Sequence, residues 1–190
     1  MLPAEIATAR LRLRRWDPAY APALKDALDD SVQHLHGWIP RAVAESAAID
    51  QLEARLRGYS AAFDDDREWL FAIIRADDEV LLGGIGLHPR VATVRVPAAV
   101  ADRVELGYWL RRTAVGHGYV TEAAAGVLAL AAALPGHGHV ELRCDPRNRP
   151  SIAVAERLGF RHVGFAPRPA LGESIPELMI WERRPSPAAG

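Results

Sequence analysis

The sequence predicts a single mixed α/β domain. Its 190 residues are close to the length of one ordinary domain. Apolar stretches in the first half are typical of strands joined by a tight turn, whereas strands and helices alternate in the second half. We expect one domain over residues 1–190, with its core at about 8–184 and a loose tail at 185–190.

The first half is expected to hold one strand, two helices and a hairpin. Leucines 11 and 13 alternate with arginines, as in a half-buried strand, and Asp17-Pro18 is a typical helix start. The turn at 76–79 separates two apolar runs. The expected elements are a strand over Leu11–Arg14, helices from Asp17 to about Asp29 and over Val43–Tyr59, and strands over Trp69–Ile74 and Val80–Leu87.

The second half is expected to contain two successive β-α-β units. Glycine and proline residues end its helices, and Asn148 is a good N-cap with Pro150 in the first turn. The expected elements are a strand over Arg103–Leu110, a helix over Tyr119–Leu134 stopped by Pro135-Gly136, a strand over His139–Cys144, a helix from Asn148 to Gly159, and strands over Phe160–Phe165 and Glu177–Trp181.

Composition narrows the classes of partner. The chain is 49% hydrophobic and 25% charged, which is typical of a globular protein, and its formal net charge of −1 argues against blanket neutralisation of nucleic-acid phosphates. Cys144 is the only cysteine, so no intramolecular disulfide forms. No signal segment or apolar run of ~20 residues is present. We expect a cytoplasmic protein with neither nucleic acid nor membrane as a partner.

The turn from Val115 to Gly118 has the character of a phosphate-binding loop. It follows a strand and leads into a helix at Tyr119, so unpaired amides and the positive end of the helix dipole meet there. Glycines at 116 and 118 leave room for a phosphate and permit a positive φ. His117, Arg111 and Arg112 add positive charge. The alternative is a plain strand-to-helix turn.

Two familiar phosphate motifs fit this loop poorly. A P-loop requires Lys and Ser/Thr after the second glycine, where this chain has Tyr119 and Val120. A dinucleotide-binding fold requires a third glycine at the position of Thr121 and an acidic residue at the end of the next strand, where Glu141 instead lies near the beginning. Dinucleotide binding is therefore the weaker interpretation. The second glycine cluster, at 83–86, opens no helix and is expected to be a bulged or closely approached strand.

Three motifs in order resemble the GNAT acetyltransferases. They are Glu105-Leu106-Gly107-Tyr108-Trp109-Leu110, Gly116-His117-Gly118-Tyr119-Val120-Thr121-Glu122-Ala123, and Asn148-Arg149-Pro150-Ser151 through Leu158-Gly159-Phe160. The nearest resemblance is to the RimJ/RimL-like branch, which acetylates the N-termini of ribosomal proteins, and His34-Leu35-His36-Gly37-Trp38 is similar to its early substrate-side segment. The resemblance covers nearly the whole chain and implies a central twisted mixed sheet flanked by helices.

The resemblance implies acetyl-CoA as the donor. The pyrophosphate would lie on the amides from Val115 to Thr121, and the pantetheine arm would pair like a strand along Tyr108–Leu110. Asn148 and Ser151 resemble the pair that faces the cofactor sulfur and pantetheine. One departure is Thr113, where the family usually has Gln or Arg three residues before the first loop glycine. Oligomeric state stays open, with a homodimer as one option.

Amide formation requires a neutral amine, so a base or a water chain must first remove a proton. Glu105 is the leading candidate, because related enzymes have an acidic residue at this point of the strand. The alternative is a surface glutamate or a salt-bridge partner of Arg103. Amides near Trp109 and Leu110 would stabilise the oxyanion. Ser151 is a candidate acid for the leaving thiolate, although it also suits a helix-capping role.

The other reactive side chains give weaker signals. A lone cysteine at the end of an apolar strand is usually packing, so we reject a covalent acetyl-enzyme at Cys144. The histidines show no spacing typical of zinc, and we predict no metal. On a strand, His34 and His36 would point the same way. With Trp38 they would line an acceptor pocket built by the first helices and residues 167–176, although core packing suits Trp38 equally.

The expected function is therefore acetyl-CoA-dependent N-acetylation of a primary amine by direct attack in a ternary complex. We favour a protein N-terminal α-amine as the acceptor. A small-molecule amine, such as an antibiotic or aminoacyl metabolite, is the alternative within catalysis. A non-catalytic acyl-CoA-binding module and a dinucleotide-binding protein are the alternatives outside it.

Overall fold

A computed structural model describes residues 2–92, 94–133, 139–167 and 177–184. One mixed sheet runs through the molecule in the order β1-β2-β3-β4-β6-β7-β9-β8, with β5 paired to β4. The strands are β1 (Glu5–Ala7), β2 (Leu11–Arg15), β3 (Trp69–Arg75), β4 (Leu81–Val91), β5 (Val94–Arg95), β6 (Arg103–Leu110), β7 (Val140–Cys144), β8 (Arg161–Ala166) and β9 (Leu178–Arg183).

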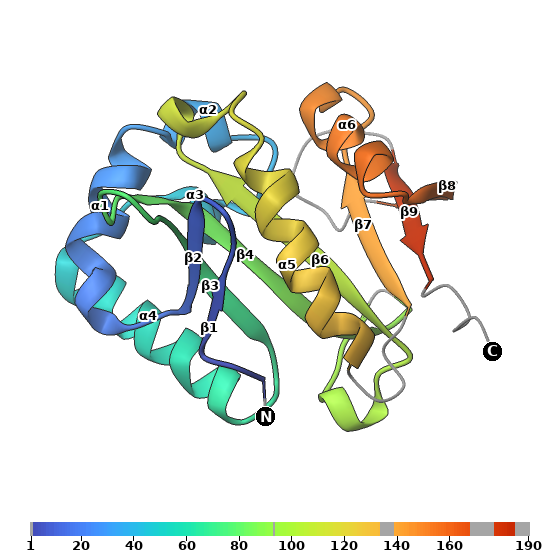
Figure 1. Cartoon of the computed structure of the whole chain (residues 1–190), viewed down its shortest axis with the longest axis horizontal. Coiled ribbons are helices and arrows are strands. Elements are labelled where there is room, and N and C mark those ends of the chain that lie inside the picture. Colours follow the sequence, from blue (N-terminus) through green and yellow to red (C-terminus); the bar gives the residue numbers. More distant parts are fainter. Residues whose placement is uncertain (1, 93, 134–138, 168–176, 185–190) are drawn as a thin grey trace.

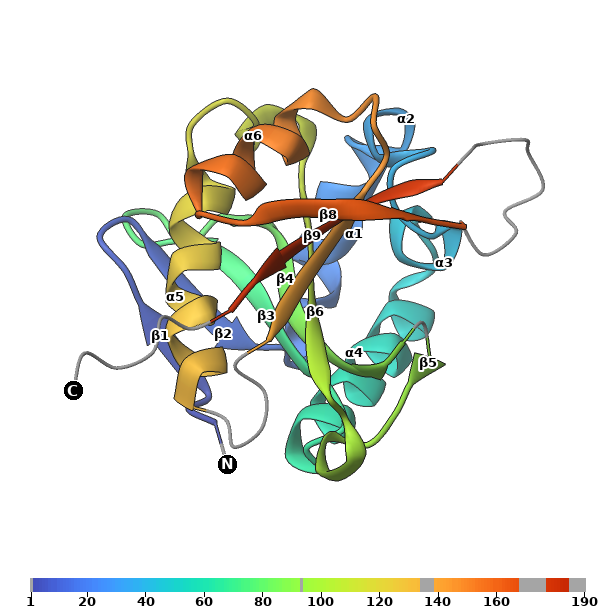
Figure 2. The ribbon, with the colours of Figure 1, turned by 90° about the vertical axis from the view of Figure 1, so that its right-hand side faces the viewer.

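Helices cover both faces of this sheet. The helices are α1 (Ala21–Asp29), α2 (Val32–Leu35), α3 (Arg41–Ala44), α4 (Ile49–Asp64), α5 (Tyr119–Ala133) and α6 (Arg149–Arg157), with 3-10 turns at Pro18–Tyr20, Ala98–Val100 and Arg112–Ala114. Figure 2 shows α5 on one side of the sheet and α1, α3 and α4 on the other. The expected mixed α/β fold is confirmed. Within the described ranges, no helix combines the length and apolar character needed to cross a bilayer.

Strand alternation sorts the side chains of β6 between two cores. Val104 and Leu106 belong to the core beneath α5, whereas Trp109 packs with residues of α1 and α4. Glu105, Gly107 and Trp109 therefore share the face covered by α1 to α4. Those helices lie over the β2–β4 half of the sheet (Figure 1).

Most of the expected elements are confirmed, including the β3–β4 hairpin and the parallel β6-α5-β7 unit. Asp17 accepts from the Ala19 N–H at 2.8 Å, and Asn148 accepts from the Ser151 N–H at 3.2 Å, so both caps form. The glycine cluster at 83–86 is closely approached: a Cβ at Gly83 would lie 2.1 Å from the Trp109 carbonyl oxygen. The Pro135-Gly136 stop and the tail at 185–190 lie outside the described residues.

Three expectations about the elements need correction. β9 lies between β7 and β8 and is antiparallel to both, so the second β-α-β unit encloses an inserted strand. Residues 32–35 form a short helix, so His34 and His36 do not lie together on a strand. The helix expected over Val43–Tyr59 is two helices, α3 and α4. The short strands β1 and β5 carry no alternation long enough to have predicted them.

Candidate active site

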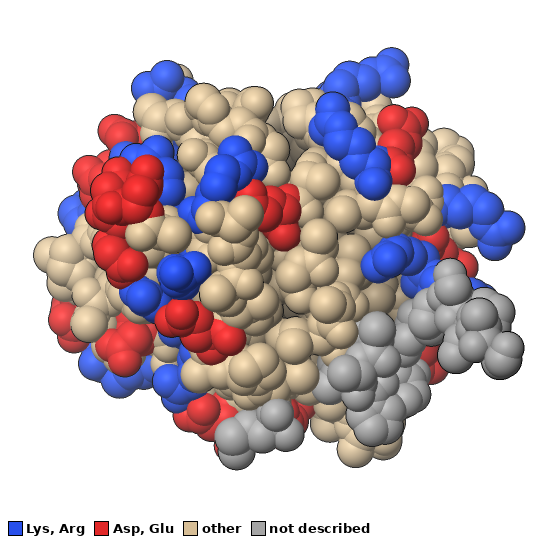
Figure 3. Space-filling model, in the orientation of Figure 1, with Lys and Arg blue, Asp and Glu red and all other residues tan. Residues whose placement is uncertain are grey.

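The sheet opens between β6 and β7. These parallel strands pair Val104 with Val140, Glu105 with Glu141 and Leu106 with Leu142, and the pairing ends there. Beyond it, β6 continues to Leu110 and stays paired with β4. The two halves of the molecule on either side of this gap carry α5 and α6 (Figure 1). On the same face the surface is furrowed between them, with Lys and Arg side chains on both sides of the furrow (Figure 3).

The peptide groups of β6 point alternately to its two neighbours. The Val104 N–H donates to the His139 carbonyl oxygen at 3.0 Å, on the β7 side, and the Arg111 N–H donates to the Leu82 carbonyl oxygen at 2.7 Å, on the β4 side. Alternation along the strand then turns the Tyr108 and Leu110 amides toward the gap and the Trp109 amide toward β4. Of the two amides expected to hold an oxyanion, Leu110 is the one that faces the gap.

The glycine loop lies at the same end of β6. Gly116 and Gly118 both have positive φ, +82° and +78°, as the loop was expected to require. A Cβ at Gly116 would meet nothing within 4 Å, so the loop is open to a ligand on that side. The helix begins at Tyr119, and the Glu122 N–H donates to the Gly118 carbonyl oxygen at 3.1 Å. Its earlier amides are therefore the ones offered to an anion.

Arg10 reaches this loop from the other end of the chain. Its Nη1 donates to the His117 carbonyl oxygen at 3.1 Å, and its guanidinium lies 4.7 Å from the centre of the Tyr119 ring. Glu122 holds it through a 2.7 Å ion pair. Sequence reasoning missed Arg10 because nothing local to it indicates a partner more than 100 residues away.

The Arg111 side chain is already ion-paired, so it contributes less charge to the loop than expected. The Arg111 guanidinium pairs with the carboxylates of Asp26 and Asp30 in α1, at 3.1 and 2.8 Å. The Arg112 N–H donates to Ser31 Oγ at 3.0 Å. Arg111 therefore anchors α1 and Asp30 to the end of β6, and the Arg112 backbone anchors Ser31 there.

Ser151 faces Tyr108 across the gap. The two hydroxyl oxygens are 2.7 Å apart, and Asn148 fixes the Ser151 backbone through the N-cap. Burial raises the pKa of Tyr108, and this outweighs the hydrogen bond with Ser151, which acts to lower it. Tyr108 therefore stays protonated. Cys144 is buried, and its burial raises its thiol pKa, which supports the packing role expected for it.

Glu105 lies in a cluster of arginines on the other face of β6. Arg90 Nε lies 2.5 Å from Glu105 Oε2, and Arg143 Nε lies 3.5 Å from the same oxygen. The alternative expected for Glu105 was a salt bridge with Arg103. That partner is wrong, because Arg103 pairs with Asp102 and Glu141. Glu105 is nevertheless an ion-paired residue, with the guanidinium groups of Arg90 and Arg143 beside its carboxylate.

A hollow of about 300 Å³ adjoins this cluster on the β6–β9 half of the sheet. One wall is charged and the other is apolar. Its lining residues are Ala92, Arg103, Glu141, Arg143, Val163, Gly164, Phe165, Ala166, Ile180 and Glu182. The expected acceptor residues lie elsewhere: His34 is on the short helix α2, and Trp38, which is 40% exposed, follows it. Of the expected segment at 167–176, residues 168–176 lie outside the described ranges.

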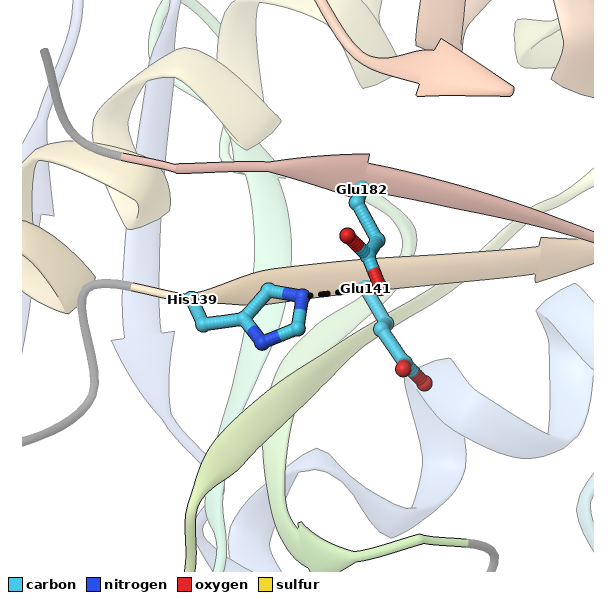
Figure 4. A group of neighbouring side chains, drawn as sticks. All are labelled: His139, Glu141 and Glu182. Atoms are coloured by element: carbon cyan, nitrogen blue, oxygen red, sulfur yellow. Dashed lines mark ion pairs between the residues drawn. The ribbon is translucent and has the colours of Figure 1, made fainter. Parts of the chain in front are cut away.

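His139, Glu141 and Glu182 form a group with one potential ligand atom each within 4.8 Å of the others (Figure 4). His139 Nε2 lies 3.2 Å from Glu182 Oε1. Glu141, however, already accepts from Arg103 at 2.5 Å and from Arg143 at 2.8 Å, one guanidinium on each oxygen. Two arginines on the central carboxylate disfavour a divalent cation, so we interpret the group as an ion-pair network.

A mixed sheet that opens beside a glycine-rich helix N-terminus is suited to an elongated ligand that carries phosphate. In a comparison with known protein families, the family model described as "Acetyltransferase (GNAT) domain" matches residues 10–161. The chain belongs to this family of acyltransferases.

Individual relatives agree with the family. "Probable N-acetyltransferase YjcK" of Bacillus subtilis (strain 168) is 29% identical over 118 residues, which are 62% of this chain and 62% of that relative. RimL, a ribosomal L7/L12 alpha-N-protein acetyltransferase in complex with coenzyme A, has a TM-score of 0.79 at 18% identity over 95% of this chain and 97% of its own. The microcin C7 self-immunity acetyltransferase MccE, in complex with acetyl-CoA and AMP, has a TM-score of 0.80 at 17% identity over 96% and 97%.

Proposed function

We propose that the protein transfers the acetyl group of acetyl-CoA to a primary amine by direct attack in a ternary complex. The observation that carries this proposal is the gap between β6 and β7, which ends beside two positive-φ glycines at a helix start. A thioester arm that pairs with the open edge of β6 places its pyrophosphate at the loop. The two solved relatives that hold coenzyme A or acetyl-CoA support this choice of donor.

On this proposal, the amides from Val115 to Thr121 bind the pyrophosphate. The pantetheine arm pairs along Tyr108–Leu110, and Asn148 holds the start of α6 beside it. The Leu110 amide, which faces the gap, donates to the oxyanion of the tetrahedral intermediate. A preorganised donor of this kind lowers the barrier because it is already oriented when the charge develops.

Ser151 is the proposed donor to the departing thiolate. Its hydroxyl lies 2.7 Å from that of Tyr108, which can donate to it. When Tyr108 donates to Ser151 Oγ, the Ser151 proton is free to be given to the coenzyme A sulfur. The pair therefore orients one proton toward the atom that acquires negative charge.

Glu105 is the proposed acidic residue of the acceptor site. It shares the α1–α4 face with Trp109 and lies on the strand that receives the thioester. The shortest contacts from Arg90 and Arg143 both reach Oε2, and we propose that the carboxylate binds the ammonium group of the acceptor directly or through a bridging water. Whether Glu105 also takes the proton stays a prediction.

For the acceptor, we favour the α-amine of a protein N-terminus. The likeness to RimL, described as an alpha-N-protein acetyltransferase, supports this choice. The likeness to MccE, which holds AMP as well as acetyl-CoA, supports a small-molecule amine as the second candidate.

The test is thiol release from acetyl-CoA with peptides that begin with serine or alanine and with a panel of small primary amines. Turnover with peptides alone supports the first acceptor class, and turnover with small amines alone supports the second. Acetyl-CoA that raises the melting temperature without turnover on any amine would indicate a non-catalytic acyl-CoA-binding module. A thermal shift with NAD and none with acetyl-CoA would contradict the proposal altogether.

A further inference from the structure

A carboxylate–imidazole pair lies on the acceptor side of the sheet. His88 Nδ1 is 3.2 Å from Glu68 Oε1, and the two side chains are only 14% and 19% exposed. Glu68 directly precedes β3, and His88 lies in β4, so two neighbouring strands position the pair. A histidine oriented by a partly buried carboxylate is an arrangement used for proton transfer.

The second ring nitrogen points into the proposed site. His88 is paired with Glu105 in the β4–β6 register and lies on the same face of the sheet. A Cβ at Gly107 would lie 3.2 Å from His88 Nε2, so the imidazole extends over the glycine that separates Glu105 from Trp109. The missing side chain at 107 is what gives the ring this position. Nε2 therefore lies beside the part of β6 where the thioester is proposed to bind.

The hydrogen bond to Glu68 selects the form of the ring. A carboxylate accepts only from Nδ1–H, which leaves the lone pair of neutral His88 on Nε2. Burial acts to raise the pKa of Glu68, but the contacts with His88 and Arg95 outweigh it and hold the pKa below its ordinary value. Glu68 thus stays charged and can stabilise an imidazolium.

We propose that His88, oriented by Glu68, is the general base that deprotonates the acceptor amine, an inference that rests on the proposed acetyltransferase function. One proton of the ammonium group passes to His88 Nε2 and then to water. The neutral amine attacks the acetyl carbon, the C–N bond forms and the C–S bond breaks. The second proton lost by the nitrogen ends on the coenzyme A sulfur, so the products are the amide, coenzyme A and one proton.

The charged groups around His88 suit this role. Glu105 lies opposite it on β6, and Arg90 of β4 and Arg143 of β7 pair with Glu105. Arg95 of β5 contacts Glu68 at 2.5 Å, and Tyr59 of α4 lies close enough to both for their charges to affect its pKa. Two carboxylates, Glu68 and Glu105, thus lie beside the ring, and each of them is paired with an arginine.

The test compares kcat, KM and pH profiles, with acetyl-CoA and the serine-initiated peptide or small amine that the wild-type protein acetylates. His88→Gln is expected to lower kcat about 100-fold with little change in the KM for acetyl-CoA. The wild-type kcat/KM is expected to fall as the pH is lowered, because the base must be neutral, and this fall is expected to disappear in the variant. Glu68→Gln is expected to move that fall to lower pH, because it removes the anion that stabilises the imidazolium.

Two further variants separate a base from a structural residue. His162→Gln, on the exposed edge strand β8, is the matched control and is expected to keep the wild-type pH profile. Added imidazole is expected to restore part of the activity of His88→Ala, because a small base can enter the space left by the ring. An active wild-type protein whose His88→Gln variant keeps its rate and pH profile would overturn the His88 role alone. A wild-type protein that acetylates none of the amines would overturn both proposals.

Discussion

The hydroxyl groups of Tyr108, in β6, and Ser151, in α6, lie 2.7 Å apart. Tyr108 lies in the part of β6 that pairs with β4 and no longer with β7. Ser151 lies in the first turn of α6, the helix that follows β7. The contact therefore joins the two halves of the molecule at the point where the thioester sulfur is proposed to lie. It also gives a direct test of the proton path.

Tyr108→Phe removes the hydroxyl that orients Ser151 while keeping the ring. We expect a loss of about 1 kcal/mol in the free energy of unfolding, typical of one hydrogen bond. We also expect kcat to fall about tenfold, because the Ser151 proton is then oriented less well. A double-mutant cycle with Ser151→Ala checks this: the effects on kcat should be strongly non-additive. Additive effects would show that the two hydroxyls act independently.

Glu105→Gln keeps the shape of the side chain and removes its charge. We expect kcat/KM for the amine to fall by about 10 to 100-fold, since the acceptor ammonium loses its anionic partner. Acetyl-CoA affinity, followed by thermal shift, should stay close to wild type. Glu53→Gln on α4 is the matched control, because Glu53 has a surface pair with Arg57 far from the gap. An unchanged kcat/KM would remove Glu105 from the site.

Gly118→Ala tests the loop. Because Gly118 has a φ of +78°, alanine there is strained by about 1 to 3 kcal/mol, and its Cβ lies 3.7 Å from Arg10 Nη2. We expect weaker binding of acetyl-CoA, measured by calorimetry, together with a lower melting temperature. Gly58→Ala is the control: Gly58 lies within α4, where alanine should stabilise the helix by about 0.5 to 1 kcal/mol. Equal acetyl-CoA affinity in Gly118→Ala and the wild-type protein would argue against phosphate binding by this loop.

Glu141 makes stability depend on pH. Burial acts to raise its pKa, but the hydrogen bonds from Arg143 and Arg103 outweigh it, so the pKa lies below the ordinary value of 4.5. A carboxyl with a depressed pKa in the folded state stabilises the protein above its ordinary pKa and loses that contribution as the pH falls. Glu141→Gln should therefore cost about 3 kcal/mol at pH 7 and much less near pH 3. Urea unfolding at both pH values measures this difference, and a cost independent of pH would contradict the assignment.

Local patterns were enough to predict most helices and strands. Leucine–arginine alternation identified β2, and side-chain caps at Asp17 and Asn148 marked helix starts. These signals act over a few residues, so the sequence displays them directly. The order of β8 and β9 was beyond such reasoning, because strand neighbours depend on packing between segments far apart in the chain.

The sequence by itself determined the glycine loop, since positive φ at 116 and 118 is a property that the residue type alone makes favourable. It also determined the candidate pair Glu105 and Ser151. Only the tertiary structure decided what surrounds them: Arg10 at the loop, Tyr108 against Ser151, Arg90 and Arg143 against Glu105, and Glu68 against His88. These partners come from different elements of one sheet and its helices. Their contacts arise from strand register and from close packing at glycines, which no local pattern encodes.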